Sequence, residues 1–335
     1  MSAFLSHRWR SAAAAFALGT IALVLLMTTG GAARAGSTIV SPAGDPFVGR
    51  HLYLDPNSPA RLAATAMRAT NPAGAGALDL VASQSSADWF GGWNSTATVA
   101  ATIRSRVAQE TAAGDYPVLV VYNIPALDCS AYGTSGAANA AAYQAWLKQV
   151  EAGIGTSSVA VIVEPDALAG LSCLTSAQQT ERLSLIKWDA QTLSALGHAA
   201  VYLDAGNAGW QPASVMSNRL NSAGVYYARG FSLNVSNYDS TASEMAYGRE
   251  IASGSGWKHY VVDTGRNGLG SNGQWCNASG RALGDRPTAK TNDDLADALL
   301  WIKPPGESDG TCNGGPTAGT FWSDYAIGLA QRASW

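Results

Sequence analysis

Acidic residues follow the apolar segments of this sequence in a regular way. The apolar run at 159–163 leads directly into the tripeptide EPD, which ends at Asp166. Further runs lead to Asp128, Asp204 and Asp309. A single aspartate in such a place commonly caps a helix, but capping explains a succession of them less well. Two chemistries use clustered acids: binding of a hard cation through oxygen ligands, and hydrolysis of a glycosidic bond by one protonated and one ionised carboxyl.

Tryptophans in glycine-rich segments favour the second chemistry. The chain has 11 tryptophans, and several of them lie in DWFGGW, NAGW and GQWC, which we expect to be loops. These residues are Trp89, Trp93, Trp210 and Trp275. Packing in the core is the alternative, but a flat indole at a loop can also stack on the apolar face of a sugar ring. We therefore expect a groove with aromatic platforms beside the acids.

Apolar runs alternate with alanine-rich segments, and this rhythm predicts the secondary structure. Strands are expected at 51–56, 117–125, 159–166, 199–206, 228–238, 259–265 and 299–310. Helices are expected at 58–71, 95–113, 137–153, 175–196, 212–222, 240–252 and 291–298. Continuous Val, Ile and Leu runs are typical of parallel strands that are covered on both faces.

The alternation favours an α/β fold, a parallel (β/α) barrel of TIM-like type. An open doubly wound sheet is the alternative, but no GxGxxG opens a helix after a strand. No Pro/Ser/Thr-rich linker divides the chain, so we expect a single domain over residues 36–335. Because the active site of such a barrel lies at the C-terminal ends of its strands, the acids should gather at one mouth.

The first 35 residues have the layout of a secretory signal peptide. His7, Arg8 and Arg10 precede an apolar run at 12–27, and Ala33-Arg34-Ala35 resembles a cleavage site. An uncleaved membrane anchor is the alternative. No second apolar stretch of about 18 residues follows, so the mature protein should be secreted and free of the membrane.

The net charge indicates which class of partner to exclude, and the cysteine content indicates whether disulfides form. The net charge of −3 argues against a nucleic-acid partner. The cysteines Cys129, Cys173, Cys276 and Cys312 of an exported chain suggest two disulfides. Three pairings are possible, and pairing of sequence neighbours closes the shorter loops. No CxxC motif or Cys/His cluster indicates a zinc site, and we expect no metal.

Ordered motifs resemble glycoside hydrolase family 6, the inverting cellulases. They are VVYNIPALDC (120–129), VIVEPDALA (161–169), YLDAG (202–206), NVSNY (234–238), DTGRNG (263–268), WCNASGRA (275–282) and WIKPPGESDG (301–310). The match runs from about Tyr53 to the C-terminus and includes the spacing of both cysteine pairs. The resemblance implies a distorted barrel of about seven strands that cuts β-1,4-glucan without a cofactor.

The resemblance assigns the catalytic roles by position. Asp166 corresponds to the general acid that protonates the leaving oxygen. Asp128 corresponds to its partner, which raises the pKa of the acid and helps to handle the catalytic water. Asp309 occupies the place usually proposed for the base.

Substrate contacts are implied in the same way. Tyr122 should lie under the reacting sugar, and Lys303 and Glu307 should bind sugar hydroxyls. Trp89, Trp210 and Trp275 should be platforms. The remaining expected contacts are Asp204, Asn207, Ser236, Asn237 and Arg281.

Two positions depart from the family pattern. Leu127 stands where the family usually has Arg, which should raise the pKa of Asp128 or Asp166. Asn207 stands where the family usually has His; an amide donates a hydrogen bond but carries no charge. We expect altered sugar binding here rather than loss of function.

Short stretches between the paired cysteines favour an open cleft, and hence an endo-β-1,4-glucanase. No binding module is visible, which suggests soluble or amorphous glucan as the substrate, and we expect the enzyme to act as a monomer. One alternative is a secreted β-glucan-binding protein with weak or lost catalysis, which the two departures would suit. Another is a calcium-stabilised exported hydrolase or lyase.

Overall fold

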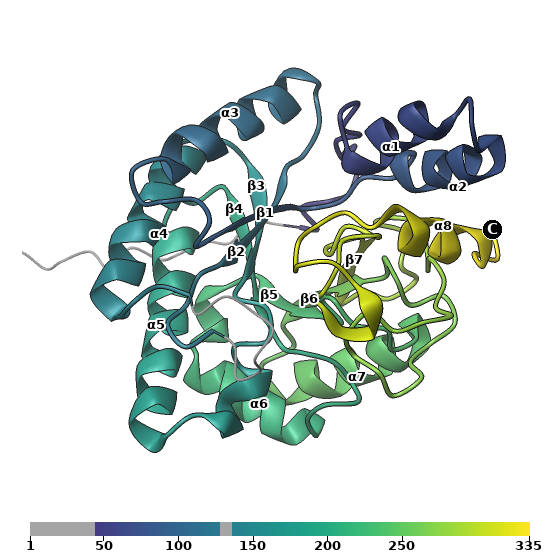
Figure 1. The fold of residues 1–335 in the computed structure, drawn as a ribbon. Helices are drawn as coiled ribbons and strands as arrows, with labels where there is room; N and C mark the ends of the chain where they lie inside the picture. The colour runs from purple at the N-terminus through teal and green to yellow at the C-terminus, as the bar shows by residue number, and fades with distance from the viewer. Residues whose placement is uncertain (1–43, 128–135) are drawn as a thin grey trace, which may run out of the picture. The chain divides into compact units, whose positions relative to one another are not determined.

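The computed structural model describes residues 44–127 and 136–335. These residues form a seven-stranded parallel sheet whose strands follow one another in sequence order (Figure 1). The strands are β1 (Asp88–Gly91), β2 (Val118–Tyr122), β3 (Val159–Val163), β4 (Ala199–Asp204), β5 (Gly230–Leu233), β6 (His259–Asp263) and β7 (Ala296–Leu300). The α/β barrel-like fold of about seven strands expected from the sequence is therefore confirmed.

The barrel stays open between its first and last strands. No pairing of β1 with β7 occurs in the described sheet, whose order runs from β1 to β7 without closing. The two edges nevertheless meet through the N–H of Ala87, which donates to the carbonyl of Trp301 at 3.0 Å. The indole N–H of Trp89 donates to the carbonyl of Ile302 at 2.8 Å. These bonds link the start of β1 to the residues that directly follow β7.

Alternate side chains of the strands face the two sides of the sheet. On β2, Leu119 and Val121 pack with the helices, whereas Val118 and Val120 belong to the cluster inside the barrel. The outer layer consists of α3 (Val99–Ala112), α4 (Ala140–Ile154), α5 (Ser176–Ser194), α6 (Ala213–Ser222) and α7 (Thr241–Gly254), which surround the sheet in Figure 1. Burial on both faces explains the continuous apolar runs of the sequence.

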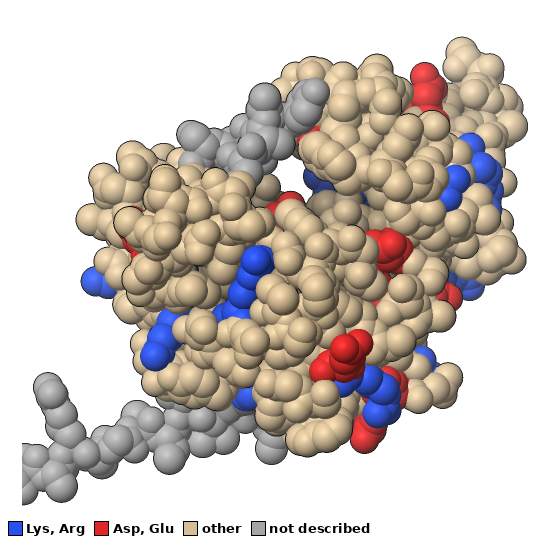
Figure 2. All heavy atoms as spheres, turned by 90° about the horizontal axis from the view of Figure 1, so that it is seen from below, with Lys and Arg blue, Asp and Glu red and all other residues tan. Residues whose placement is uncertain are grey.

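Three further helices pack together near β7. They are α1 (Pro59–Met67), α2 (Pro72–Ala82) and α8 (Ser323–Gln331), and they share a core with Leu283 and Trp301. Short 3₁₀ helices occupy Ala169–Cys173, Val225–Tyr227 and Cys312–Gly314. In the part of the chain that the structure describes, no helix is long and apolar enough to span a bilayer. On the face drawn in Figure 2, most of the surface is uncharged and the charged side chains lie in small groups.

Two predicted elements at the ends of the barrel are wrong. Residues 51–56 form no strand, and β1 instead lies in the DWFG segment that we expected to be a loop. Glycine is required in β1 because a Cβ on Gly91 would lie 2.6 Å from the carbonyl oxygen of Tyr122. The predicted helix at 291–298 is also wrong, since β7 begins at Ala296. Pairing with β6 overrides the helix propensity of its Ala and Leu residues.

Helix boundaries are set mainly by caps. The expected helix at 58–71 ends at Met67, because Asn71 caps a new helix by accepting a bond from the N–H of Gly74 and Pro72 begins it. The helix α8 was not expected. Cys276 and Cys312 form a disulfide with a Cα–Cα distance of 6.2 Å. Cys129 lies outside the described residues, so its pairing with Cys173 stays a prediction.

Candidate active site

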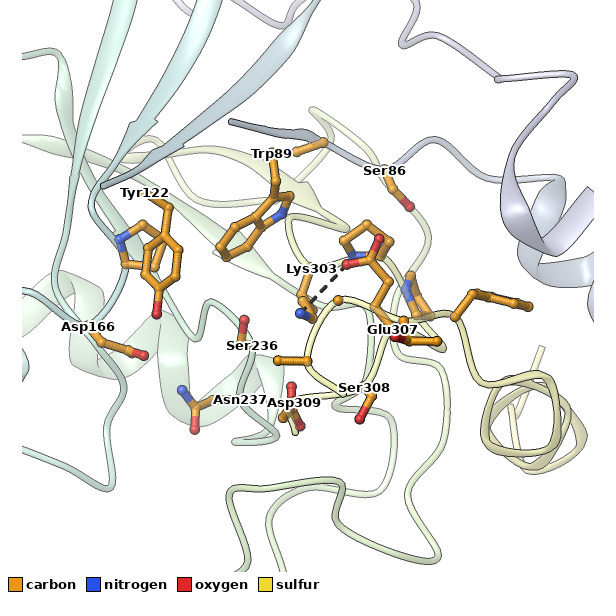
Figure 3. Close-up of a pocket in the computed structure, with 18 of the residues that line it drawn as sticks. Ser86, Trp89, Tyr122, Asp166, Ser236, Asn237, Lys303, Glu307, Ser308 and Asp309 are labelled. Carbon is orange, nitrogen blue, oxygen red and sulfur yellow. Dashed lines mark ion pairs between the residues drawn. The ribbon is translucent and has the colours of Figure 1, made fainter. Parts of the chain in front are cut away.

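The C-terminal ends of the strands open into a cleft of about 1310 Å³. It is lined by most of the site residues expected from the sequence (Figure 3). These are Trp89, Tyr122, Asp166, Asn207, Trp210, Ser236, Asn237, Trp275, Lys303, Glu307 and Asp309. Trp93 and Leu127 also line the cleft. Strand ends that are far apart in the sequence thus contribute to one concave surface.

Asp166 lies at the end of a tight turn after β3. Glu164 and Asp166 both have a positive φ, 51° and 69°, which is uncommon for residues with a side chain. The turn is stabilised by Glu164, whose buried carboxylate accepts bonds from the N–H groups of Asn123 and Ile124 at 3.0 Å. The unusual EPD sequence therefore joins the loop after β3 to the loop after β2, and it directs Asp166 into the cleft.

A buried arginine holds the same two loops from the other side. The Arg182 guanidinium on α5 donates to the carbonyl of Ala167 at 3.3 Å and to that of Pro125 at 2.8 Å, and it also donates to the carbonyl of Ala126. Backbone N–H groups of these loops thus bond to a carboxylate, and backbone carbonyls bond to a guanidinium.

Asp204 lies beneath Asp166 rather than in the lining of the cleft. Its Oδ1 accepts bonds from the N–H groups of Asp166 at 2.9 Å and Gly206 at 3.0 Å, and its Oδ2 accepts one from the hydroxyl of Ser232 at 2.9 Å. Burial, followed by the negative charge of Asp166, raises the pKa of Asp204 to about 8. Asp204 therefore acts on the backbone of Asp166 from beneath the cleft.

Asp309 forms a buried ion pair with Arg266. The guanidinium donates to both carboxylate oxygens, at 3.0 Å and 2.8 Å, and is itself 1% exposed. The N–H of Asn277 donates to Oδ2 at 2.8 Å, and the hydroxyl of Tyr238 donates to it at 3.3 Å. Most of these bonds converge on Oδ2, which fixes the orientation of the carboxylate at the cleft.

One further carboxylate fixes three of the strand-end loops. Asp263, at the end of β6, accepts bonds from the N–H groups of Ser236 (3.1 Å), Gly265 (2.9 Å), Ile302 (3.2 Å) and Lys303 (2.9 Å). Its side chain is 3% exposed, and burial raises its pKa. Asp263 thereby places the backbone of two lining residues, one after β5 and one after β7.

Aromatic and charged side chains from the ends of β1, β2 and β7 lie together in the lining of the cleft. Tyr122 and Trp89 meet edge to face with ring centroids 5.4 Å apart, and the ammonium of Lys303 lies 5.3 Å from the Trp89 ring centre. Lys303 also pairs with Glu307 at 3.6 Å, as the dashed line in Figure 3 marks. Burial raises the pKa of Glu307. Trp210 and Trp275 are exposed by 43% and 52%.

The loop after β4 carries the departure at position 207. The side-chain oxygen of Asn207 accepts a bond from the N–H of Gly209 at 3.0 Å, and the next residue, Ala208, donates to the buried Glu244 at 2.9 Å. Burial raises the pKa of Glu244 to about 8. Asn207 therefore helps to shape its own loop as well as line the cleft.

One further expected contact, Arg281, is not among the residues that line the cleft. Its guanidinium donates to the carbonyls of Leu269 and Gly270 at 3.2 Å and 2.8 Å, so a sugar contact there stays a prediction. Asp128 lies outside the described residues, and its role stays a prediction as well.

Sequence reasoning assigned no role to the residues that hold the site. Arg266 and Asp263 are both in the DTGRNG segment, and the strand-end rule alone would have selected Asp263. Nothing local could have identified Arg266, because its partner Asp309 is 43 residues away. Among the described residues, no group of three or more His, Cys, Asp or Glu side chains could hold a metal ion.

Comparison with known proteins agrees with this geometry. The sequence model described as "Glycosyl hydrolases family 6" matches residues 47–333. Endoglucanase A of Cellulomonas fimi is 43% identical over 84% of this chain, and the matched region is 61% of that protein's length. Endoglucanase 1 of Streptomyces halstedii is 40% identical over 82% of this chain and 86% of its own.

A solved structure is similar over nearly its whole length. The endoglucanase Cel6 of Mycobacterium tuberculosis, in complex with methyl-cellobiosyl-4-deoxy-4-thio-β-D-cellobioside, superposes with a TM-score of 0.82. It is 45% identical, and the match covers 86% of this chain and 99% of the other.

Proposed function

The chain belongs to glycosyl hydrolase family 6, and on that premise we propose that it is an exported endoglucanase. It hydrolyses internal β-1,4 bonds of cellulose-type glucans with inversion at the anomeric carbon. The observation that carries this proposal is the meeting of Asp166 and Asp309 in one cleft whose rim presents exposed tryptophans. A β-1,4-glucan is a ribbon of sugar rings, so flat indoles and hydroxyl-binding groups along a cleft suit it.

In this mechanism Asp166 is the general acid. It lies in the loop that Glu164 and Asp204 fix, and it protonates the leaving oxygen of the scissile bond. A water attacks the opposite face of the sugar, which in inverting enzymes needs about 6.5–9.5 Å between the two carboxyl groups. Asp309 activates this water, or Asp128 does so through a second water. Tyr122 lies under the reacting ring, and Lys303 and Glu307 bind hydroxyls beside it.

The ion pair with Arg266 bears on the role of Asp309. Because the guanidinium donates to both oxygens of Asp309, the carboxylate has a fixed orientation at the cleft and is suited to orienting a water there. We therefore propose that Asp309 orients the attacking water. The proton of this water passes to neighbouring water molecules.

Endo cutting is the preferred mode. The three similar proteins named above are all endoglucanases by name. The loop from Cys276 to Cys312 spans 36 positions, which leaves little chain to roof the cleft. An open cleft admits the middle of a polymer, so internal bonds are cut.

Export, domain organisation and oligomeric state belong to the same proposal. Residues 1–35 act as a signal peptide, residues 36–335 form a single catalytic domain, and the mature enzyme acts as a monomer. Mass spectrometry of the exported protein should find Gly36 at the N-terminus, and an N-terminus within residues 1–10 would contradict cleavage.

The proposed activity is tested by viscosity and reducing ends together. On carboxymethyl cellulose, the wild-type enzyme should lower the viscosity quickly while few reducing ends appear, and Asp166→Ala should do neither. A slow viscosity change with many reducing ends would indicate exo cutting. Binding without any release of reducing ends would indicate the alternative, a β-glucan-binding protein.

A further inference from the structure

A fully buried hydrogen-bonded group lies behind the loop that carries Asp166. It consists of Glu164 after β3, Tyr143 on α4 and Asp189 on α5, and each of these side chains is 0% exposed. The phenol oxygen of Tyr143 lies 2.9 Å from Oε1 of Glu164 and 2.7 Å from Oδ2 of Asp189. Two carboxyl groups thus contact one hydroxyl inside the protein.

Counting protons shows that both carboxyl groups cannot be ionised. The phenol of Tyr143 has one proton, so it can donate in only one of these two short contacts. If Glu164 and Asp189 were both carboxylates, one of the two contacts would place lone pairs against each other at hydrogen-bond distance. One carboxyl must therefore carry a proton and donate it to the oxygen of Tyr143.

The surroundings of Glu164 favour its charged form. Its two oxygens accept bonds from the N–H of Asn123, and Oε2 also accepts one from the N–H of Ile124, all at 3.0 Å. Burial raises the pKa of Glu164 to about 7, and these N–H groups, the Tyr143 hydroxyl and the positive charge of Arg182 all act in the opposite direction. A carboxylate with several donors and a guanidinium nearby is well placed to stay ionised.

The surroundings of Asp189 favour its neutral form. Its Oδ1 is buried and has no hydrogen-bond partner in the described part of the chain. The charged groups that face it are the acids Glu164 and Glu151, and burial followed by the charge of Glu164 raises the pKa of Asp189. An isolated ionised carboxylate in such a place would be costly.

We propose that Asp189 is a carboxylic acid that keeps its proton at neutral pH and donates it to Tyr143, which in turn donates to the ionised Glu164. The chain of donors has one direction, from α5 through α4 to the loop after β3. Asp189 and Tyr143 are then positioning residues: they hold the acceptor that fixes the loops of the cleft. Their effect on catalysis rests on the function proposed above, whereas the location of the proton does not.

The consequence for the cleft follows from what Glu164 holds. Its bonds to Asn123 and Ile124 set the start of the loop that reaches Leu127, and its own backbone leads through Pro165 to Asp166. Loss of the donor from Tyr143 would let Glu164 shift, and both loops would shift with it.

Infrared spectroscopy tests the location of the proton. A protonated carboxyl has a C=O band apart from that of carboxylates, and the difference between wild type and Asp189→Asn at neutral pH isolates the band of this residue. We expect one protonated-carboxyl band to disappear in the variant. An unchanged set of protonated-carboxyl bands would overturn the proposal, whether or not the protein hydrolyses glucan.

Paired substitutions test whether Asp189 is neutral. The amide of Asp189→Asn can still donate to Tyr143, so its melting temperature and kcat should stay close to those of wild type, whereas Asp189→Ala loses the donor and should lower both. Equal damage from the two variants would overturn the proposal, because a neutral amide of the same shape should replace a side chain that is itself neutral.

A tyrosine variant tests the positioning role. Tyr143→Phe should lower kcat about tenfold with KM changed less, since it acts through the loop of the acid. Tyr260→Phe is the matched control: it removes the hydroxyl of another tyrosine that is 0% exposed, and this hydroxyl bonds to Asp293 outside the cleft. Equal effects of the two variants on kcat would contradict a positioning role for Tyr143.

Discussion

The backbone N–H of Asp166 donates to the side chain of Asp204 at 2.9 Å, so the proposed acid is held by a second, buried carboxyl. The bond explains why two acidic strand ends are neighbours here. Asp204 is 1% exposed and acts on the backbone of Asp166, whereas the side chain of Asp166 lines the cleft. Asp204 thus positions the loop, whereas Asp166 is the group that is proposed to react.

The raised pKa of Asp204 predicts a pH-dependent stability. Because its pKa rises from 3.8 to about 8 on folding, the folded state binds more protons than the unfolded state between these values. Its contribution to stability is therefore present at low pH and is lost as the pH rises through this window. Wild type should lose stability relative to Asp204→Asn from about pH 4 to pH 8, as urea unfolding at several pH values would measure. A constant difference would contradict the assignment.

The buried pair of Arg266 and Asp309 predicts a strong coupling. Arg266→Met should lower the free energy of unfolding by about 3 kcal/mol, because it leaves the buried carboxylate of Asp309 without its partner. The double variant Arg266→Met/Asp309→Asn should recover part of this loss, which denaturant unfolding would reveal as a non-additive cycle. Strict additivity of the two substitutions would show that the pair contributes little.

Asp263 is predicted to act on substrate binding from beneath the cleft. Asp263→Asn replaces an acceptor of several backbone N–H groups by an amide that accepts fewer, so Ser236 and Lys303 should be displaced and KM should rise about tenfold. Asp297→Asn is the matched control, because Asp297 is also a buried strand carboxylate, 2% exposed, but it bonds to Tyr202 and Arg229. Steady-state kinetics should show a raised KM in the first variant alone.

Exposed indoles at the rim are predicted to bind the glucan. Trp210→Ala should weaken binding of a cello-oligosaccharide about tenfold, from the loss of ring stacking and buried area. Trp257→Ala removes an equally large side chain that is 63% exposed and is not among the lining residues, so its affinity should be unchanged. Calorimetric titration would distinguish them, and equal affinities would exclude Trp210 as a platform.

The sequence predicted the general architecture because its strongest signals are local. The continuous run at β3 and the helix α5 were found to within a few residues, since strands buried on both faces and the long helical segments between them leave clear patterns. Acidic residues at successive strand ends predicted the location of the cleft, because this pattern is also local in the sequence. The edge strand β1 was missed, and the last strand was expected at 299–310 rather than at Ala296–Leu300, because the conformation of these strands depends on pairing with a neighbour as well as on their own residues.

The supporting residues of the site could not be predicted in this way. Arg266 meets Asp309, and Asp189 meets Tyr143, only after the barrel has curled, and such partners are 43 and 46 residues apart. No local pattern marks Arg266 or Asp189 as a residue that holds another one.

The central claim is that Asp166 donates the proton to the leaving group, and one ratio tests it. Asp166→Asn should lower the hydrolysis of an unactivated cello-oligosaccharide by about a hundredfold or more, the usual contribution of a general acid. It should lower the hydrolysis of dinitrophenyl β-cellobioside far less, because that leaving group departs without a proton. An equal loss on both substrates, or no loss on the first, would contradict the account.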